Sequence, residues 1–269
     1  MLLKIETKES ERAPVIFLIS AALLIAALLL LYMRRLAFSS RVTRETIELP
    51  LKMRTKTVLL ISDIHRRKTD VVVKDHRSSD FDMVWIGGDL AEKGVPEERI
   101  RQNLEELSSL APVYFVWGNN DYEGAAAAME SVLKEFGVTI LRNSSVEFQE
   151  EGGSWTLAGV DDLTMGRPSF TRIEDGLSDI AVLLSHNPDA VRWFQTGRFT
   201  CAVSGHTHGG QIRLGPFGIA ERGGWKYRNG MRLFISEGYG TTRLPLRLGT
   251  RSEYHILHIC TDEQKVFKS

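Results

Sequence analysis

Short apolar runs that end in small or polar residues recur along most of this chain, and they limit the folds it can adopt. Six runs have the length and composition of buried strands: 57–62, 83–86, 113–117, 155–160, 180–185 and 200–204. Helical patterns occupy three of the intervals: 96–110, 124–136 and 187–195. Two more strands, at 232–236 and 254–260, and a glycine-rich loop or hairpin region over 209–229 follow. Strands that alternate with helices in this way predict an α/β domain.

Candidate metal ligands come directly after these runs. Four clusters carry most of them: Asp63-Ile64-His65, Gly88-Asp89, Gly118-Asn119-Asn120-Asp121 and Gly205-His206-Thr207-His208. With His186, the candidates are Asp63, His65, Asp89, Asn119, His186, His206 and His208. Open α/β sheets place their sites at the carboxyl ends of the strands, so we expect these side chains to converge. Carboxylate and amide oxygens mixed with imidazole nitrogens suit transition metals and magnesium.

The spacing of the ligands suggests how they are shared. In an extended segment, residues i and i+2 point to the same side, so Asp63 with His65, and His206 with His208, should each converge on a metal ion. Asp89 is the natural bridge because its carboxylate has two oxygens. Each motif alone is weak, since Gly-Gly-Asp is an ordinary turn. Their ordered occurrence at one edge favours a dinuclear site, which is suited to hydrolysis at phosphorus.

The N-terminal segment differs from everything after it. Residues 13–33 carry no charge and, at about 1.5 Å per residue, can cross a hydrocarbon core of about 30 Å as a helix. A cleaved signal peptide is the alternative, but the segment is long for one and no small-x-small cleavage site follows it. We expect a retained single-pass anchor in the cell membrane. The expected division is a tail over 1–12, an anchor over 13–33, a juxtamembrane segment and first strand over 34–55, and a globular domain over 56–269.

Charge bears on the membrane side and on the partners. The basic residues that flank the span are Lys4, Lys8 and Arg12 before it, and Arg34, Arg35, Arg41 and Arg44 after it. The excess after the span favours a cytoplasmic domain. The whole chain has 34 basic and 34 acidic residues and a net charge of +0. This balance argues against an extended nucleic-acid-binding surface.

The motifs, in this order, resemble the calcineurin-like metallophosphoesterase family from about Thr57 to the end of the chain. The matching stretches are SDIH (62–65), GGDL (87–90), GNND (118–121), SHNPD (185–189) and SGHTHGGQ (204–211). The ending FISEGYGTTRLPLR (234–247) and the apolar segment are similar to a membrane-anchored bacterial branch. That branch contains YkuE- and YaeI-type phosphoesterases and UDP-2,3-diacylglucosamine pyrophosphatase-type enzymes. The resemblance implies a four-layer α/β/β/α sandwich over 56–269, with metal ions at the strand ends.

The resemblance also implies how two divalent ions divide the ligands. One ion would be served by Asp63, His65, Asp89 and His208, and the other by Asp89, Asn119, His186 and His206. Mn, Fe, Zn and Mg all suit this ligand mix. A hydroxide that bridges two such ions attacks a phosphodiester or pyrophosphate bond.

One position departs from the family pattern. Many members have Gly-Asn-His-Asp/Glu, in which the histidine acts on the leaving-group oxygen, whereas this chain has Asn120. Asparagine can donate a hydrogen bond but cannot supply a proton by titrating. Asp121 then lacks an imidazole to orient. We take Asn120 and Asp121 as candidate catalytic residues, and expect pyrophosphates or activated diesters to be cleaved in preference to alkyl monoesters.

Arg66 and Arg67 directly follow the first ligand pair and are candidate substrate-binding residues, for a phosphate or a lipid headgroup; a solvated loop is the alternative. The leading hypothesis is a membrane-anchored phosphohydrolase with a lipid-linked or UDP-sugar-lipid substrate. A cyclic-nucleotide or nucleic-acid phosphodiesterase would use the same metal site, although the neutral charge disfavours nucleic acid. A metal-binding scaffold without catalysis is the third hypothesis, and the complete ligand set argues against it.

Overall fold

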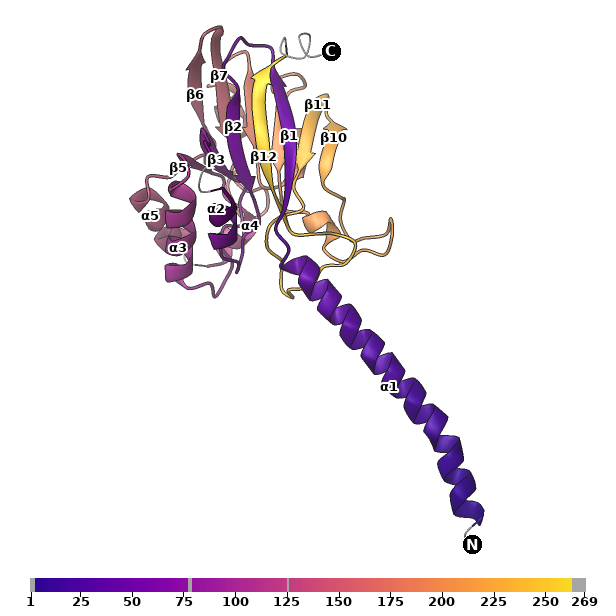
Figure 1. The fold of residues 1–269 in the computed structure, drawn as a ribbon. Helices are drawn as coiled ribbons and strands as arrows, with labels where there is room; N and C mark the ends of the chain where they lie inside the picture. The colour runs from indigo at the N-terminus through magenta and orange to yellow at the C-terminus, as the bar shows by residue number, and fades with distance from the viewer. Residues whose placement is uncertain (1–2, 77–78, 125, 263–269) are drawn as a thin grey trace.

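Two six-stranded sheets form the body of the computed structural model, which describes residues 3–76, 79–124 and 126–262 (Figure 1). The first sheet has the order β1 (Arg41–Leu49), β12 (Glu253–Thr261), β2 (Lys56–Ile61), β3 (Met83–Ile86), β4 (Val113–Phe115) and β5 (Thr139–Ile140). The second has the order β10 (Gly224–Arg228), β11 (Met231–Ile235), β9 (Cys201–Ser204), β8 (Ala181–Leu184), β7 (Gly153–Gly159) and β6 (Ser144–Glu150). Strands β2 to β5 are parallel, and so are β7, β8, β9 and β11. Both sheets are therefore mixed, because β12 runs antiparallel to β2, and β6 and β10 are antiparallel edge strands.

An apolar core fills the space between the two sheets. In β2, Val58 and Leu60 point into this core, whereas Leu59 and Ile61 point to the opposite face, where helices cover the sheet. Successive strand residues alternate between faces, so a strand that is covered on both sides must be apolar throughout. This is why the continuous apolar runs predict buried strands.

Helices cover the outer faces of both sheets. Outside the first sheet lie α2 (Asp70–His76), α3 (Glu97–Ser108) and α5 (Ala126–Glu135), and α4 (Asn119–Glu123) is a short helix after β4. Outside the second sheet lie α6 (Phe170–Glu174) and the 3₁₀ helix η1 (Pro188–Trp193), which pack on Leu183 and Ala202. A further 3₁₀ turn, η2 (His208–Gly210), follows β9. The predicted four-layer α/β/β/α sandwich is confirmed.

Some elements differ from the sequence-based prediction. The helix expected over 187–195 is the 3₁₀ helix η1, in which the Asn187 side chain accepts a hydrogen bond from the Asp189 N–H at 2.9 Å. The strands β6 and β10 were not predicted separately, because both are edge strands whose residues are mostly half-exposed and show no continuous apolar run. Residues 1–2, at the start of the predicted tail, and residues 263–269, at the end of the predicted domain, lie outside the described residues.

A single long helix, α1 (Leu3–Ala37), projects from the domain (Figure 1). Its stretch Pro14–Ala37 is 24 residues long, and by length and composition it could cross a membrane. Side chains such as Phe17, Leu23 and Leu31 are exposed along it. The helix is thus longer than the apolar segment over 13–33, and Met33 and Leu36 at its end pack against the domain.

Candidate metal centre

The segments that follow five strands, at one edge of the two sheets, supply all seven candidate ligands. Asp63 and His65 follow β2, Asp89 follows β3, Asn119 follows β4, His186 follows β8, and His206 and His208 follow β9. The first three strands are parallel neighbours in one sheet, and β8 and β9 are parallel neighbours in the other. Their carboxyl ends therefore bring the loops together, as predicted for an open α/β sheet.

The ligand atoms form two adjacent groups. One contains Asp63, His65 and His208, and the other contains Asp63, Asp89 and His186; within each, the ligand atoms lie within 4.8 Å of one another. In the first group, Nε2 of His208 lies 3.2 Å from Nε2 of His65 and 3.3 Å from Oδ1 of Asp63. In the second, Nε2 of His186 lies 3.3 Å from Oδ2 of Asp89.

The other two candidates lie beside the second group. Nδ1 of His206 is 3.1 Å, and Oδ1 of Asn119 is 3.2 Å, from Nε2 of His186. Oδ2 of Asp89 also lies 3.7 Å from Nε2 of His65, so this carboxylate faces both groups. Convergent carboxylate, amide and imidazole atoms are a donor set that fits divalent cations. Asp63 belongs to both groups, whereas the family resemblance implies that Asp89 is the shared ligand.

The backbone reason that we gave for the paired ligands is wrong. Asp63, His65, His206 and His208 have φ values of 55°, 52°, 71° and 50°, so these four residues have left-handed backbone and the two segments are not extended. Asp63 and His65 still face one group, but His206 turns toward His186 and His208 toward His65. The His-x-His motif therefore contributes one imidazole to each group. Left-handed backbone at non-glycine residues is uncommon and concentrates at functional sites.

Glycines make room for the carboxylates. A Cβ atom on Gly118 would lie 2.2 Å from Oδ1 of Asp89, and one on Gly205 would lie 2.5 Å from Oδ2 of Asp63. Both distances are far below a van der Waals contact, so no larger residue fits at either position without displacing a ligand. The glycines beside the ligands in the sequence thus have a direct packing role.

Burial and charge act in opposite directions on the ionisable groups. Burial alone would raise the pKa of the Asp63 and Asp89 carboxyl groups, but the neighbouring histidines outweigh it, and both pKa values lie below the usual range. Burial would lower the pKa of His186, but the charge of Asp89 raises it to about 10. At His208 burial prevails and lowers the pKa to about 3. Both carboxylates are thus kept ionised, the state that binds a cation.

Outer partners orient two of the imidazoles, and one partner was missed in the sequence. Nδ1 of His186 lies 2.9 Å from the carbonyl oxygen of Gly87, which leaves Nε2 facing the other ligands. Nδ1 of His65 lies 3.2 Å from Oε2 of Glu92, at ion-pair distance. Partners of this kind fix the ring orientation of metal-binding histidines. Glu92 follows Asp89 by three residues, and its proximity to that motif is the signal that could have identified it.

The two candidate catalytic residues contact different parts of Asp89: Asn120 its carboxylate and Asp121 its backbone N–H. Asn120 donates from its side chain to Oδ2 of Asp89 at 2.6 Å and from its backbone to Oδ1 at 2.9 Å. Asp121 is buried, and its carboxylate accepts the backbone N–H groups of Asp89, Ala91 and Gly118 at 2.8, 3.0 and 2.9 Å. This carboxylate holds the ligand loops after β3 and β4 together, which indicates a positioning role.

A cavity of about 780 Å³ opens over the ligands. Arg66 lines it, together with Lys93 and Arg243. Arg67 does not line it. Its Nη1 donates to the carbonyl oxygens of Ser39, at 2.9 Å, and Tyr239, at 2.6 Å. The guanidinium of Arg67 thus ties the segment after α1 to the ligand loop, and the substrate-binding role predicted for it is not compatible with this position.

Comparisons with known proteins bear on the identity of the site. The profile of the calcineurin-like phosphoesterase family matches residues 56–210. YpbG of Bacillus subtilis is 42% identical over 212 residues, which cover 77% of this chain and 82% of YpbG. The metallophosphoesterase YkuE of the same organism is 34% identical over 56% of this chain and 57% of its own. The phosphodiesterase YaeI of Escherichia coli is 27% identical, over 66% and 70%. The chain belongs to the calcineurin-like phosphoesterase family and is a metal-dependent phosphoester hydrolase, in agreement with the names of its relatives YkuE and YaeI.

Proposed function

We propose that this protein is a membrane-anchored hydrolase that cleaves a phosphodiester or pyrophosphate bond with two divalent cations. The proposal depends above all on the two adjacent ligand groups, in which Asp63 is shared and Asp89 faces both. A cation held in each group would flank a single phosphoryl group. When bound, such cations supply an activated water for in-line attack and offset the charge that develops on the phosphoryl oxygens.

We assign the ligands as the family resemblance implies. Asp63, His65, Asp89 and His208 hold one cation, and Asp89, Asn119, His186 and His206 hold the other. The chain's own contribution is to keep both carboxylates ionised, to hold the rings of His65 and His186 by their Nδ1 atoms, and to leave the cavity open on one side. Mn, Fe, Zn and Mg are the candidate cations.

The preferred leaving group follows from Asn120. Its amide donates to the Asp89 carboxylate and has no proton to give up near neutral pH. Asp121 is committed to three backbone N–H groups, and it does not line the cavity over the ligands. We therefore propose substrates whose leaving group needs no proton, such as a diphosphate or an activated diester, over alkyl monoesters.

The position of α1 supports a lipid-linked substrate. Figure 1 shows α1 leaving from the end of the sheets where β2 and β3 terminate, and the ligand loops begin at those termini. Arg67 joins the segment after α1 to the loop that carries Asp63 and His65. A membrane that contains α1 would thus lie near the cavity. We place the domain on the cytoplasmic side because basic residues are more numerous after the span than before it. A C-terminal reporter that is active on only one side of the membrane tests this orientation.

Turnover of a chromogenic diester by the purified full chain tests the proposal. We expect manganese to activate the enzyme, and Asp89→Asn to lower kcat by at least a hundredfold. Asp179→Asn, at an exposed position, is the matched control and should keep the wild-type rate. Metal content measured on the same samples should fall only in the Asp89 variant. Metal-independent turnover, or an active Asp89→Asn enzyme, would contradict the proposed centre.

A further inference from the structure

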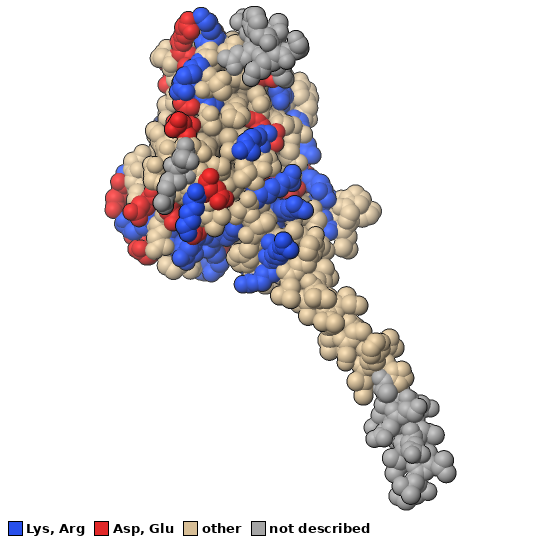
Figure 2. Space-filling model, in the orientation of Figure 1, with Lys and Arg blue, Asp and Glu red and all other residues tan. Residues whose placement is uncertain are grey.

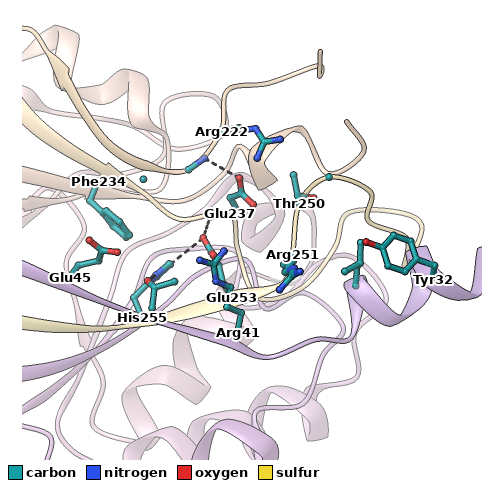
Figure 3. Close-up of a pocket in the computed structure, with 15 residues that line it drawn as sticks. Tyr32, Arg41, Glu45, Arg222, Phe234, Glu237, Thr250, Arg251, Glu253 and His255 are labelled. Carbon is teal, nitrogen blue, oxygen red and sulfur yellow. Dashed lines mark hydrogen bonds and ion pairs between the residues drawn. The ribbon is translucent and has the colours of Figure 1, made fainter. Parts of the chain in front are cut away.

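A second cavity, of about 700 Å³, lies between the end of α1 and the β10–β11 hairpin (Figure 3). Tyr32 and Leu36 of α1 line one side of it, and Thr43 and His255 of the first sheet line another. None of the seven candidate metal ligands lines it, so it is separate from the metal centre. Its volume falls within the range of about 300–1,000 Å³ that is typical of small-molecule sites.

Three exposed arginines, Arg41, Arg222 and Arg251, line this cavity (Figure 3). Among the residues that the structure describes, none of the three forms an ion pair, and Arg222 donates one hydrogen bond, to the carbonyl oxygen of Gly215 at 3.3 Å. Figure 2 shows Lys and Arg side chains gathered on the domain beside the base of the helix. Guanidinium groups that are not already paired are suited to bind a phosphate.

Carboxylates also line the cavity, but they are bonded to the protein itself. Glu45 accepts from the Trp225 indole at 2.9 Å, Glu237 from the Gly223 N–H at 3.3 Å, and Glu253 from the Glu237 N–H at 3.1 Å. All three are buried or half-buried, whereas the arginines are exposed. A ligand that approaches from the membrane side therefore meets positive charge first.

An apolar loop lies next to the same cavity. Leu214, Phe217 and Ile219 are 72%, 78% and 94% exposed, and Figure 1 shows the loop before β10 projecting at the end of the domain from which α1 leaves. The loop is well braced, because the buried Arg213 donates to the carbonyl oxygens of Gly209, at 2.9 Å, and Ala220, at 2.6 Å. A rigid loop with an apolar tip beside a basic surface is the pattern of a protein that contacts the membrane interface.

We propose that this cavity binds the phosphate of an anionic phospholipid headgroup, with the Leu214–Ile219 loop in the same leaflet. The inference builds on the membrane anchoring proposed above, because Tyr32 and Leu36 place the cavity where the span leaves the bilayer. Arg41, Arg222 and Arg251 would contact the phosphate oxygens, and the acyl chains would remain in the bilayer beside α1. The site is separate from catalysis and would fix the orientation of the domain on the membrane.

Native mass spectrometry of the full chain in detergent tests the proposal. Phosphatidylglycerol, phosphatidylcholine and inorganic phosphate are added separately at matched concentrations. We expect one phosphatidylglycerol to be retained with at least tenfold preference over phosphatidylcholine. The Arg41→Gln/Arg251→Gln double variant should bind it at least tenfold more weakly, whereas the matched Arg172→Gln/Arg192→Gln control, at exposed positions away from the cavity, should bind it as the wild type does.

Three results would overturn the lipid assignment: equal retention of both lipids, unchanged binding in the double variant, or inorganic phosphate bound as tightly as phosphatidylglycerol. Diester turnover by the same samples keeps this test separate from the proposed function. Loss of turnover with retained lipid binding would contradict the proposed metal centre alone. Release of the chain from membranes by high salt without detergent would contradict the proposed membrane anchoring.

Discussion

At the scale of single residues, Glu92 should determine how firmly His65 is oriented. Its Oε2 lies 3.2 Å from Nδ1 of His65, whose Nε2 faces the other ligands. Glu92→Gln removes the charge that holds this ring, and losing such an outer partner typically costs about 10–100-fold in metal affinity. Titration of the metal-free protein with manganese measures the change. Glu123→Gln is the control, since Glu123 lines the same cavity and is exposed. Equal manganese affinities in the two variants would contradict the orienting role of Glu92.

Asn120 determines which leaving groups are tolerated. In Asn120→His, an imidazole near the leaving group can donate a proton, and such general acid catalysis is worth about 10²–10⁴-fold. We expect hydrolysis of alkyl esters to rise by at least tenfold relative to hydrolysis of nitrophenyl esters, which need no proton. The ratio of the two kcat values is the measurement. Asn120→Ala, which loses the amide bonded to Asp89, should leave this ratio unchanged. A ratio that is the same in all three enzymes would contradict the argument.

Asp121 should matter for stability more than for chemistry. Its carboxylate accepts three backbone N–H groups from two ligand loops. Asp121→Asn replaces one acceptor oxygen with an NH₂ group, which leaves a buried N–H unpaired at a cost of about 1–3 kcal/mol. For a domain of this size we expect Tm to fall by about 2–10 °C. Thermal unfolding of the metal-free protein measures it, and an unchanged Tm would contradict the positioning role.

Residue types could be predicted from sequence at this scale, but local backbone could not. The predicted ligand residues Asp63, His65 and His208 do lie together, whereas the division of the ligands between two ions, taken from the resemblance, stays a proposal. The extended geometry assumed for His206 and His208 was wrong, because φ depends on the turn into which the tertiary fold forces the chain. Arg67 was misjudged for a similar reason. A basic residue beside a ligand looks the same in sequence whether it faces the cavity or the opposite side.

At the scale of elements, the buried side chain of His255 joins β1 and β12 and should make the stability depend on pH. Nδ1 of His255 lies 2.7 Å from Oγ1 of Thr43, its partner in the parallel register, and Nε2 lies 2.8 Å from Oγ of Ser236. Burial lowers the pKa of His255 from 6.5 to about 3. The unfolded chain binds a proton on His255 more readily than the folded chain does. The contribution of the buried neutral ring to the free energy of unfolding is therefore complete above pH 6.5 and is lost as the pH falls from 6.5 toward 3.

Through His255, the free energy of unfolding falls by about 1.4 kcal/mol per pH unit below pH 6.5. Between pH 7.5 and 5.5, Tm of the wild type should therefore fall by about 3–6 °C more than that of His255→Asn. The comparison uses the full chain in detergent at constant ionic strength. His258→Asn, on the same strand, is the control and should follow the wild type. Parallel pH profiles for wild type and His255→Asn would show that this ring does not carry the effect.

Buried strands could be predicted from the sequence more readily than half-exposed ones. Strands covered on both faces, such as β2, β3 and β8, appear in the sequence as unbroken apolar runs and were predicted from them. The edge strands β6 and β10 have mixed patterns, because one side of each faces solvent. The segment over 187–195 has helix-start residues but forms a 3₁₀ helix, a distinction that a helical pattern in sequence does not make.

At the scale of the whole molecule, the anchor proposed for α1 and the metal centre should act on the same membrane. α1 leaves from the end of the sheets where the ligand loops begin (Figure 1). Tethering of this kind gives a substrate in the same bilayer an effective concentration that a substrate elsewhere does not have, an advantage of about 10²–10⁴-fold when the geometry permits. The full chain can be reconstituted into vesicles with a lipid-linked diphosphate in the same vesicles or in separate ones. We expect turnover to be at least tenfold faster in the first case, while a soluble nitrophenyl diester is hydrolysed equally in both. Equal rates with the lipid-linked substrate would mean that the cavity over the ligands does not face the membrane that α1 is proposed to cross.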